Sequence, residues 1–281
     1  MAATAITQDE AERLLREAGQ ADDGDIDLAA TALAFAARER SEAGAQRYRE
    51  HLAELSRDVL DRASGEELDA AARLDALRRV LVDIHGYRGD RVTYDDIRNA
   101  DLAHVIDRKR GLPVALSILW LHAARSAGWT MYGINFPGHF LLQLEAGDER
   151  AFVDPFNGGQ ILGRSELGEL VKALAGPEAE LATQHTTTLS NRGILLRLQN
   201  NIKVRLLKAN DPTGALVVLE GMLMVAPAKA ALWREAGLIH SQIENLRAAQ
   251  ICLANAVDLA ESPAARQRIA AELAAVRGKL N

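Results

Sequence analysis

The sequence is poor in cysteine and in aromatic residues, and it contains no long apolar run. One cysteine in 281 residues excludes an intramolecular disulfide and is typical of a reducing compartment. Aromatic residues make up only 4%, while alanine and leucine abound, which favours helices over a sandwich or barrel. No stretch approaches the roughly 20 apolar residues that span a bilayer. The opening "MAATAITQDEAERLLREAG" lacks the apolar segment of a secretory signal, so we expect a cytoplasmic protein.

The charge balance is also uninformative for the two commonest charged partners. The net charge is -6, with 26% charged and 48% hydrophobic residues, as in an ordinary globular protein. This balance does not predict binding to nucleic acid or to a membrane surface. The length is comfortable for two domains.

Helical periodicity dominates the first part of the chain. Residues 8 to about 84 predict successive amphipathic helices, and Gly86 is placed to end the last of them. Residues 87–102 read as a loop. "RKRGLPVALSILWLHAARSAGW" then predicts a buried helix, because Pro113 suits the first helical turn and Gly128 suits the end.

The period then changes to that of strands. "TMYGINF", "HFLLQLE" and "RAFVDPF" predict three short strands, and "EAGDE" predicts a hairpin turn between the last two. Residues 165 to 175 return to a helical pattern. We therefore predict an α+β domain over residues 1–180, with a helical lead-in and a small antiparallel sheet.

The last hundred residues predict a helical repeat of the tetratricopeptide type, with a 34-residue period. One copy supplies Trp233, Gly237, Ala249, Leu253 and Ala256, and a shift of one period gives Ala215, Leu219 and Pro227. The prediction is an all-α domain over 186–281, with helix pairs at about 196–229 and 230–263 and a capping helix at 264–280. A generic set of helical hairpins is the alternative. Trp233 is a candidate binding residue of this domain.

His139 and Asp154 are the candidate catalytic pair of the first domain. They lie on the two predicted hairpin strands, nearly opposite one another. An aspartate that accepts from one imidazole nitrogen leaves the other nitrogen as a base. Such a base serves a nucleophile, which in cysteine-based acyl transfer lies at a helix N-terminus. The alternative is structural, with His139 and Asp154 tying two strands together. Asp154, which precedes Pro155, could equally begin a turn.

Three segments make a family resemblance explicit. "RKRGLPVALSILWLHAARSAG", "INFPGHFLLQ" and "VDPFNGG" resemble the bacterial SirB-type family, from about residue 85 to the C-terminus. The resemblance implies a transglutaminase-like core of the papain type joined to tetratricopeptide-like repeats. It makes His139 and Asp154 the triad-like pair and puts the catalytic cysteine position at or next to Pro113, which has no nucleophile.

Other residues could replace the missing cysteine or bind a ligand. Cys252 lies inside the predicted repeat, where a buried role explains it. Ser117, one helical turn beyond Pro113, is the remnant candidate for a nucleophile, although a packing role is the alternative. Asn135 and Asn157 satisfy loop backbone groups or bind a carbonyl. The spacing of the histidines predicts no metal site, and no cofactor is expected.

These observations favour a non-catalytic transglutaminase-like protein that acts as a protein- or peptide-binding adaptor or regulator, with Pro113 at the vacant nucleophile position. The alternative is an amide or thioester hydrolase or acyltransferase that uses His139 and Asp154 with Ser117 or a water. A third is a scaffold whose repeats mediate self-association. The sequence predicts neither the identity of a partner or substrate, nor the oligomeric state, nor the pathway.

Overall fold

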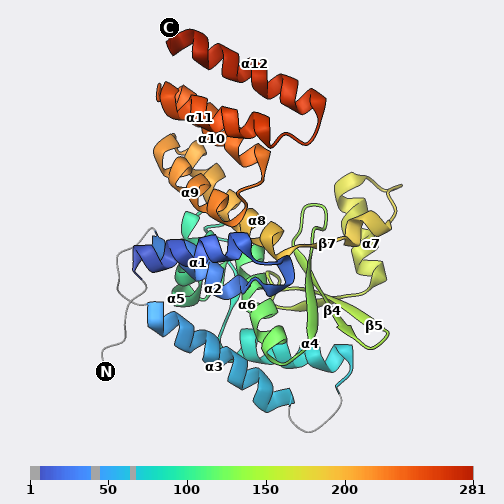
Figure 1. Ribbon diagram of the computed structural model, residues 1–281. Coiled ribbons are helices and arrows are strands. Elements are labelled where there is room, and N and C mark those ends of the chain that lie inside the picture. Colours follow the sequence, from blue (N-terminus) through green and yellow to red (C-terminus); the bar gives the residue numbers. More distant parts are fainter. Residues whose placement is uncertain (1–6, 39–44, 64–67, 281) are drawn as a thin grey trace. The chain divides into compact units, whose positions relative to one another are not determined.

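The structure, a computed structural model, describes residues 7–38, 45–63 and 68–280 and divides into two compact units (Figure 1). The first unit runs from Asp22 to Leu198 and also takes in Ala11 and the described residues before it. The second unit combines Glu12–Ala21 with the chain from Gln199 onward. None of the helices in the described ranges is long and apolar enough to cross a lipid bilayer.

The helical lead-in is confirmed. Its elements are α1 (Gln8–Gln20), the 3-10 helix η1 (Asp23–Asp25), α2 (Leu28–Arg38), α3 (Ala45–Ala63), α4 (Ala70–Arg78) and the π-helical η2 (Arg79–Ile84). Aspartates cap two of these helices: the Asp27 carboxylate accepts from Ala30 N at 3.0 Å, and the Asp69 carboxylate accepts from Ala72 N at 2.7 Å. Such caps satisfy backbone N–H groups that have no partner inside the helix.

The segment predicted as a loop contains regular structure. It holds β1 (Arg88–Gly89), η3 (Ile97–Ala100) and α5 (Leu102–Arg108), and β2 (Arg110–Gly111) pairs in parallel with β1. Asp101 begins α5, accepting from His104 N at 2.9 Å, and Lys109 ends it in the left-handed conformation with φ 54°. A helix of seven residues is too short to show a clear 3.6-residue period, so the sequence pattern missed it.

The predicted buried helix is α6 (Pro113–Ser126). Proline occupies its first turn, ten of its residues are buried, and Gly128 follows its end with φ 72°. α6 contacts α3 and α2 on the helical side and β3 and β4 on the sheet side. Its apolar surface on all sides is therefore explained, because it lies at the centre of the first unit.

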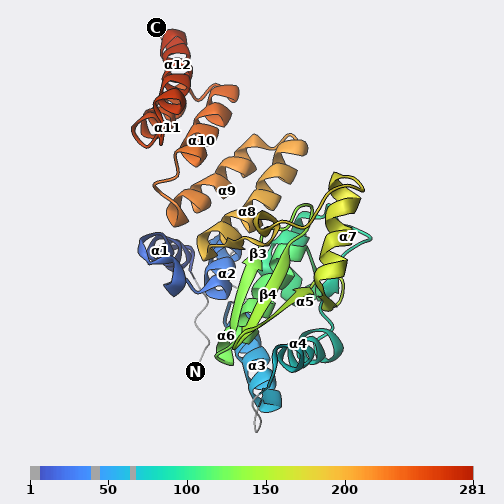
Figure 2. The ribbon, with the colours of Figure 1, turned by 90° about the vertical axis from the view of Figure 1, so that its right-hand side faces the viewer.

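The sheet has five antiparallel strands in the order β6-β5-β4-β3-β7. They are β3 (Thr130–Ile134), β4 (Leu141–Ala146), β5 (Glu149–Asp154), β6 (Gln160–Leu162) and β7 (Thr188–Leu189). The expected hairpin turn is present, with Gly147 at φ 59°, and it sets the register in which Leu142 faces Val153. The helix α7 (Arg164–Ala175) lies beside the sheet (Figure 2). Its residues Leu167 and Val171 belong to the core cluster that includes Ile134.

The second unit is all helical, as the repeat predicts. Its helices, besides part of α1, are α8 (Asn191–Lys208, from Gln199 onward), α9 (Pro212–Val225), α10 (Ala230–Gln242), α11 (Leu246–Asp258) and α12 (Pro263–Leu280). α10 and α11 approach closely at Gly237, where an added Cβ would lie 2.7 Å from Leu253 Cγ. The indole Nε1 of Trp233 donates to the Pro227 carbonyl oxygen at 2.8 Å. The glycine and the tryptophan of the repeat pattern thus serve helix packing and a turn, respectively.

Candidate functional site

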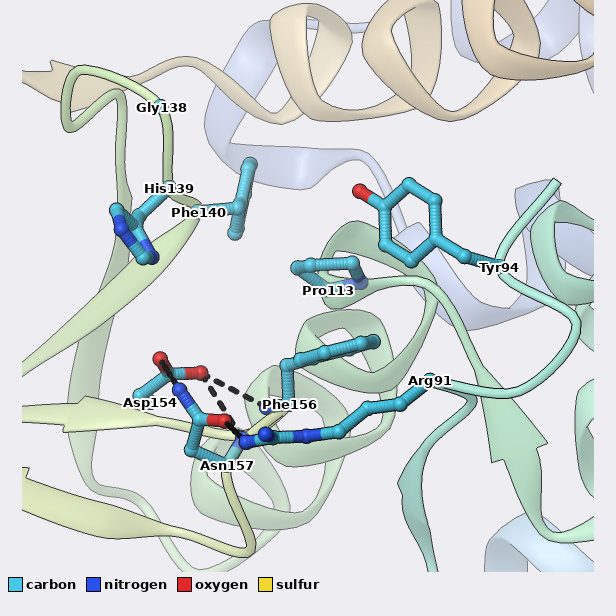
Figure 3. Close-up of a pocket in the computed structure, with 9 residues that line it drawn as sticks. All are labelled: Arg91, Tyr94, Pro113, Gly138, His139, Phe140, Asp154, Phe156 and Asn157. Atoms are coloured by element: carbon cyan, nitrogen blue, oxygen red, sulfur yellow. Dashed lines mark hydrogen bonds between the residues drawn. The ribbon is translucent and has the colours of Figure 1, made fainter. Parts of the chain in front are cut away.

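Four separate segments of the first unit surround a pocket of about 450 Å³ (Figure 3). They are the loop after β1, the N-terminus of α6, the turn before β4, and the end of β5 with the turn that follows. The lining residues are Arg91, Tyr94, Pro113, Gly138, His139, Phe140, Asp154, Phe156 and Asn157. The structure thereby brings together four of the sequence-predicted site residues, His139, Asp154, Pro113 and Asn157.

Pro113 forms part of the pocket wall as the first residue of α6. The chain reaches it through Gly111, where an added Cβ would lie 2.8 Å from the Val105 side chain and 3.4 Å from Asn99 O. Only a glycine allows this approach without displacing neighbours, and the Leu112 N–H is held by Asn99 O at 2.8 Å. The local sequence therefore fixes a helix N-terminus at the pocket, but the residue presented there has neither a thiol nor a hydroxyl.

Asp154, at the end of β5, is 4% exposed, and its carboxylate is occupied by the following turn. Oδ1 accepts from the backbone N–H groups of Phe156 at 2.9 Å and Asn157 at 3.2 Å, and Oδ2 accepts from Asn157 Nδ2 at 2.7 Å (Figure 3). This is the side-chain turn that aspartate forms readily. Gly158 and Gly159 continue it with φ values of 69° and 74°. Much of the acceptor capacity of the carboxylate is used locally.

His139 is half-buried and lies just before β4, outside the paired part of the strand. Because Leu142 faces Val153, the next pair outward would be Leu141 with Asp154, and His139 is two residues further. Figure 3 shows the imidazole and the Asp154 carboxylate facing the same space from separate places. Within the described residues no hydrogen bond joins them; the ring instead has an edge contact with Phe136, at 6.3 Å between centroids.

Ser117 is placed away from the pocket lining. It is fully buried in α6, and its Oγ finds no hydrogen-bond partner within the described part of the chain. A hydroxyl in this position is enclosed by packing. It is separated from solvent, and no hydrogen bond to His139 is formed.

The candidate binding residues occupy three different environments. Asn157 bridges the pocket floor, since it donates to Asp154 and its Oδ1 accepts from Arg91. Asn135, exposed after β3, accepts from the guanidinium of Arg197. Trp233 belongs to the second unit, where its ring packs against the cluster formed by α11 and α12.

Cationic and aromatic side chains give the pocket its chemical character, and none of them was predicted from the sequence as a site residue. Phe140 lies in the motif "FPGHF" and Phe156 lies in the motif "DPFNGG", and this position beside His139 and Asp154 was the sequence signal that could have identified them. Arg197 lies over the Phe140 ring at 5.1 Å and donates to the His139 carbonyl oxygen at 3.4 Å. Burial lowers the pKa of Arg197 from its ordinary value, yet guanidinium stays charged at neutral pH. Tyr94 meets Phe156 edge to face at 5.8 Å.

A buried ionic network holds the loop that carries Arg91 and Tyr94. Asp90 is 5% exposed and accepts from the Thr93 hydroxyl at 2.6 Å and from Arg108 Nη2 at 3.1 Å. The Thr93 hydroxyl, followed by the Thr93 backbone N–H, lowers the pKa of Asp90 to about 2. Arg108 also donates to Asn99 Oδ1 at 2.9 Å, so that the loop is tied to α5. The pocket rim is therefore built on charge-assisted hydrogen bonds.

Sequence comparisons match the two parts of the chain to two family models. Residues 46–200 match the model described as "Transglutaminase-like superfamily", and residues 202–274 match the model described as "Tetratricopeptide repeat". The chain is 34% identical to a UPF0162 protein of Vibrio cholerae over 179 residues, which is 63% of this chain and 66% of that protein. It is 31% identical to a UPF0162 protein of Xylella fastidiosa over 226 residues, 79% of this chain and 80% of that one.

A shorter match extends to an animal protein. The chain is 38% identical to the mouse F-box only protein 21 over 84 residues, which is 30% of this chain and 13% of that protein. The bacterial matches thus extend over most of the chain, whereas the animal match is confined to a segment.

Proposed function

We propose that this chain, which belongs to the transglutaminase-like superfamily, is a non-catalytic binding protein. It joins the transglutaminase-like domain to tetratricopeptide repeats, which is the SirB-type combination, and it is similar to bacterial UPF0162 proteins. In this proposal the first unit uses its pocket to hold a peptide segment of a partner protein. The repeat, a module with capacity for protein–protein interaction, offers a second surface.

The observation that carries the proposal is the chemistry of the pocket lining. None of the nine residues that the structure places around it has a thiol or an aliphatic hydroxyl, and Pro113 occupies the helix N-terminus. Covalent acyl transfer requires a nucleophile within hydrogen-bond reach of its base. His139 lines the pocket, but none of the nine lining residues offers it a thiol or an aliphatic hydroxyl to activate, which supports binding over catalysis.

The state of Asp154 supports the same proposal. A triad aspartate accepts the Nδ1–H of the histidine and so fixes its tautomer and orientation. Here the Asp154 carboxylate accepts three hydrogen bonds from the turn residues Phe156 and Asn157. A carboxylate used in this way organises a turn that closes the pocket floor.

The pocket suits a peptide that carries an apolar group beside a polar or anionic one. Phe140, Phe156 and Tyr94 offer aromatic surface, and Arg91 offers a guanidinium at the rim. Aromatic and arginine side chains are the residues that contribute most to protein–protein recognition.

Affinity capture from a bacterial lysate tests the proposal, with the intact chain compared with its His139→Ala and Phe156→Ala variants. A His185→Asn variant is the matched control, because His185 is outside the pocket lining. We expect a partner that the wild type and the control retain and that both pocket variants lose. An identical set of captured proteins for all four chains would contradict a binding role of the pocket.

The alternative function, hydrolysis of an amide or thioester, keeps His139 as the base and uses a water in place of a side-chain nucleophile. It is distinguished by incubating the chain with a simple thioester and a simple amide substrate. Turnover that disappears in the His139→Ala variant and persists in the Ser117→Ala variant would replace the binding proposal with this one. The binding proposal expects no turnover from any of the three chains.

A further inference from the structure

A cluster of metal-ligating side chains lies in the first unit outside the pocket lining. His51, Glu54 and His85 bring ring nitrogens and a carboxylate oxygen to within 4.8 Å of one another. His51 and Glu54 are three residues apart on α3, so that they share one helix face. His85 follows η2, and its ring meets the His51 ring at 5.3 Å between centroids, nearly edge to face. Two of the three side chains come from the helix and the third from a neighbouring turn.

The distances between the donor atoms suit a small cation. His51 Nδ1 and Glu54 Oε2 are 2.9 Å apart. Zinc bonds of about 2.0 Å place neighbouring tetrahedral ligands about 3.3 Å apart. Modest side-chain rotation therefore brings the three groups to a common centre. The side chain of His51 is 15% exposed and that of His85 is 10% exposed, while Glu54 is half exposed and can supply the route for an ion to enter.

Both imidazoles are already held by outer partners. The Asp58 carboxylate lies 2.6 Å from His85 Nε2, which leaves Nδ1 as the free nitrogen of that ring. The Tyr87 hydroxyl lies 2.7 Å from His51 Nε2, on the side away from Glu54. Metal-bound histidines characteristically have their second nitrogen anchored in this way, often by a carboxylate. The anchors prevent the rings from turning away from the centre.

We propose that His51, Glu54 and His85 form a binding site for one divalent transition metal of the Zn²⁺ class. Two imidazoles and one carboxylate are the donor set that such ions accept, and they leave a fourth coordination position for water. Mg²⁺ and Ca²⁺ prefer oxygen donors and do not suit it.

Lys109 provides a second, independent test of the assignment. Its Nζ lies 3.1 Å from both His51 Nε2 and the Tyr87 hydroxyl, and 4.5 Å above the Tyr87 ring. Metal at His51 Nδ1 requires the proton to reside on Nε2, which then donates to the Tyr87 hydroxyl and no longer accepts from Lys109. The ammonium also repels the cation. Removal of the charge by Lys109→Met is therefore expected to tighten metal binding.

The experiment is calorimetric titration of the intact chain with Zn²⁺ at pH 7.5, with circular dichroism of each variant as a check of folding. We expect one equivalent bound with a micromolar or lower Kd, and no heat from Mg²⁺. Glu54→Gln, at a half-exposed side chain, is expected to weaken binding at least tenfold, and Asp58→Asn by about 10- to 100-fold. His185→Asn, elsewhere in the unit, is the control that leaves the Kd unchanged.

Three results would overturn the assignment. The first is the absence of saturable binding at one equivalent. The second is a Kd that Glu54→Gln and Asp58→Asn leave unchanged, or that Lys109→Met weakens. The third is loss of binding in His139→Asn with the Glu54→Gln variant unaffected, which would place the ion in the pocket.

Discussion

Replacement of Ser117 by alanine is expected to stabilise the first unit. The Ser117 side chain is fully buried, and its Oγ lacks a hydrogen-bond partner in the described part of the chain. A buried polar group left unsatisfied costs about 1–3 kcal/mol. Alanine also exceeds serine in helix propensity by up to about 0.5 kcal/mol, which roughly offsets the dispersion energy that the oxygen atom contributes to packing. The free energy of unfolding should therefore rise by about 1–2 kcal/mol.

The measurement is urea denaturation followed by tryptophan fluorescence. A Trp233→Phe background removes the signal of the second unit, so that Trp120 and Trp129 report on the first unit. Ser126→Ala is the matched control on the same helix, because Ser126 Oγ donates to Ala123 O at 2.8 Å. Loss of that hydrogen bond should cost up to about 1 kcal/mol.

The outcome bears on function as well as on stability. A catalytic serine must reach its base and its substrate, which an enclosed, unpaired hydroxyl does not do. Destabilisation by Ser117→Ala of more than about 1 kcal/mol would show that the hydroxyl makes a hydrogen bond in solution. It would refute the account of Ser117 as a packing residue.

Three further predictions rest on side chains already described. Asp90→Asn should lower stability by about 2 kcal/mol at pH 7, because the pKa of Asp90 is lowered from 3.8 to about 2 and each unit corresponds to about 1.4 kcal/mol. This contribution to stability is complete at pH values above the pKa of Asp90 in the unfolded chain, and it is lost as the pH falls through about 2. The stabilities of the wild type and the variant, measured by acid titration, should therefore converge there. Pro113→Cys should place a thiol at a helix N-terminus, where the pKa of the thiol falls. Iodoacetamide at pH 7 should therefore label the introduced thiol of this variant faster than Cys252, because burial raises the pKa of Cys252. Equal labelling of the two thiols would contradict the position assigned to residue 113. Gly237→Val should destabilise the second unit by about 2 kcal/mol, since its side chain would overlap Leu253, and hydrogen exchange should rise in that unit while the first unit stays unchanged.

The sequence predicted the elements whose pattern is long or whose turn chemistry is strong. Examples are the 3.6-residue period over residues 8 to 84, the turn at Gly147 and the repeat around Gly237. Each of these features is determined by residues that lie close together in the sequence. The α+β class and the repeat were therefore confirmed. The strand β7 was not predicted, because Thr188 and Leu189 become a strand only by pairing with Gly133 and Ile134, and no local signal indicates such a pairing.

The site was harder to predict from the sequence than the fold, because four separate segments meet to form it. The motifs brought Pro113, His139, Asp154 and Asn157 together around one pocket, and their catalytic or binding roles remain predictions. Asp154 before Pro155 indicated a turn as one alternative. The sequence does not indicate that this turn takes up the carboxylate while His139 lies two residues beyond the pair that Asp154 would make. The cluster of His51, Glu54 and His85 was not predicted, because His85 lies outside α3 and joins the other two side chains only in the folded chain.

The division into units has a consequence for how the chain is made. Residues 12–21 belong to the same compact unit as the chain from residue 199 onward, and the whole of the first unit's main body is inserted between them. At Gly19 an added Cβ would overlap the carbonyl oxygen of Met224. On the ribosome these early residues emerge long before their partners exist. The contact between Gly19 and Met224 can therefore form only after the whole inserted body has been synthesised.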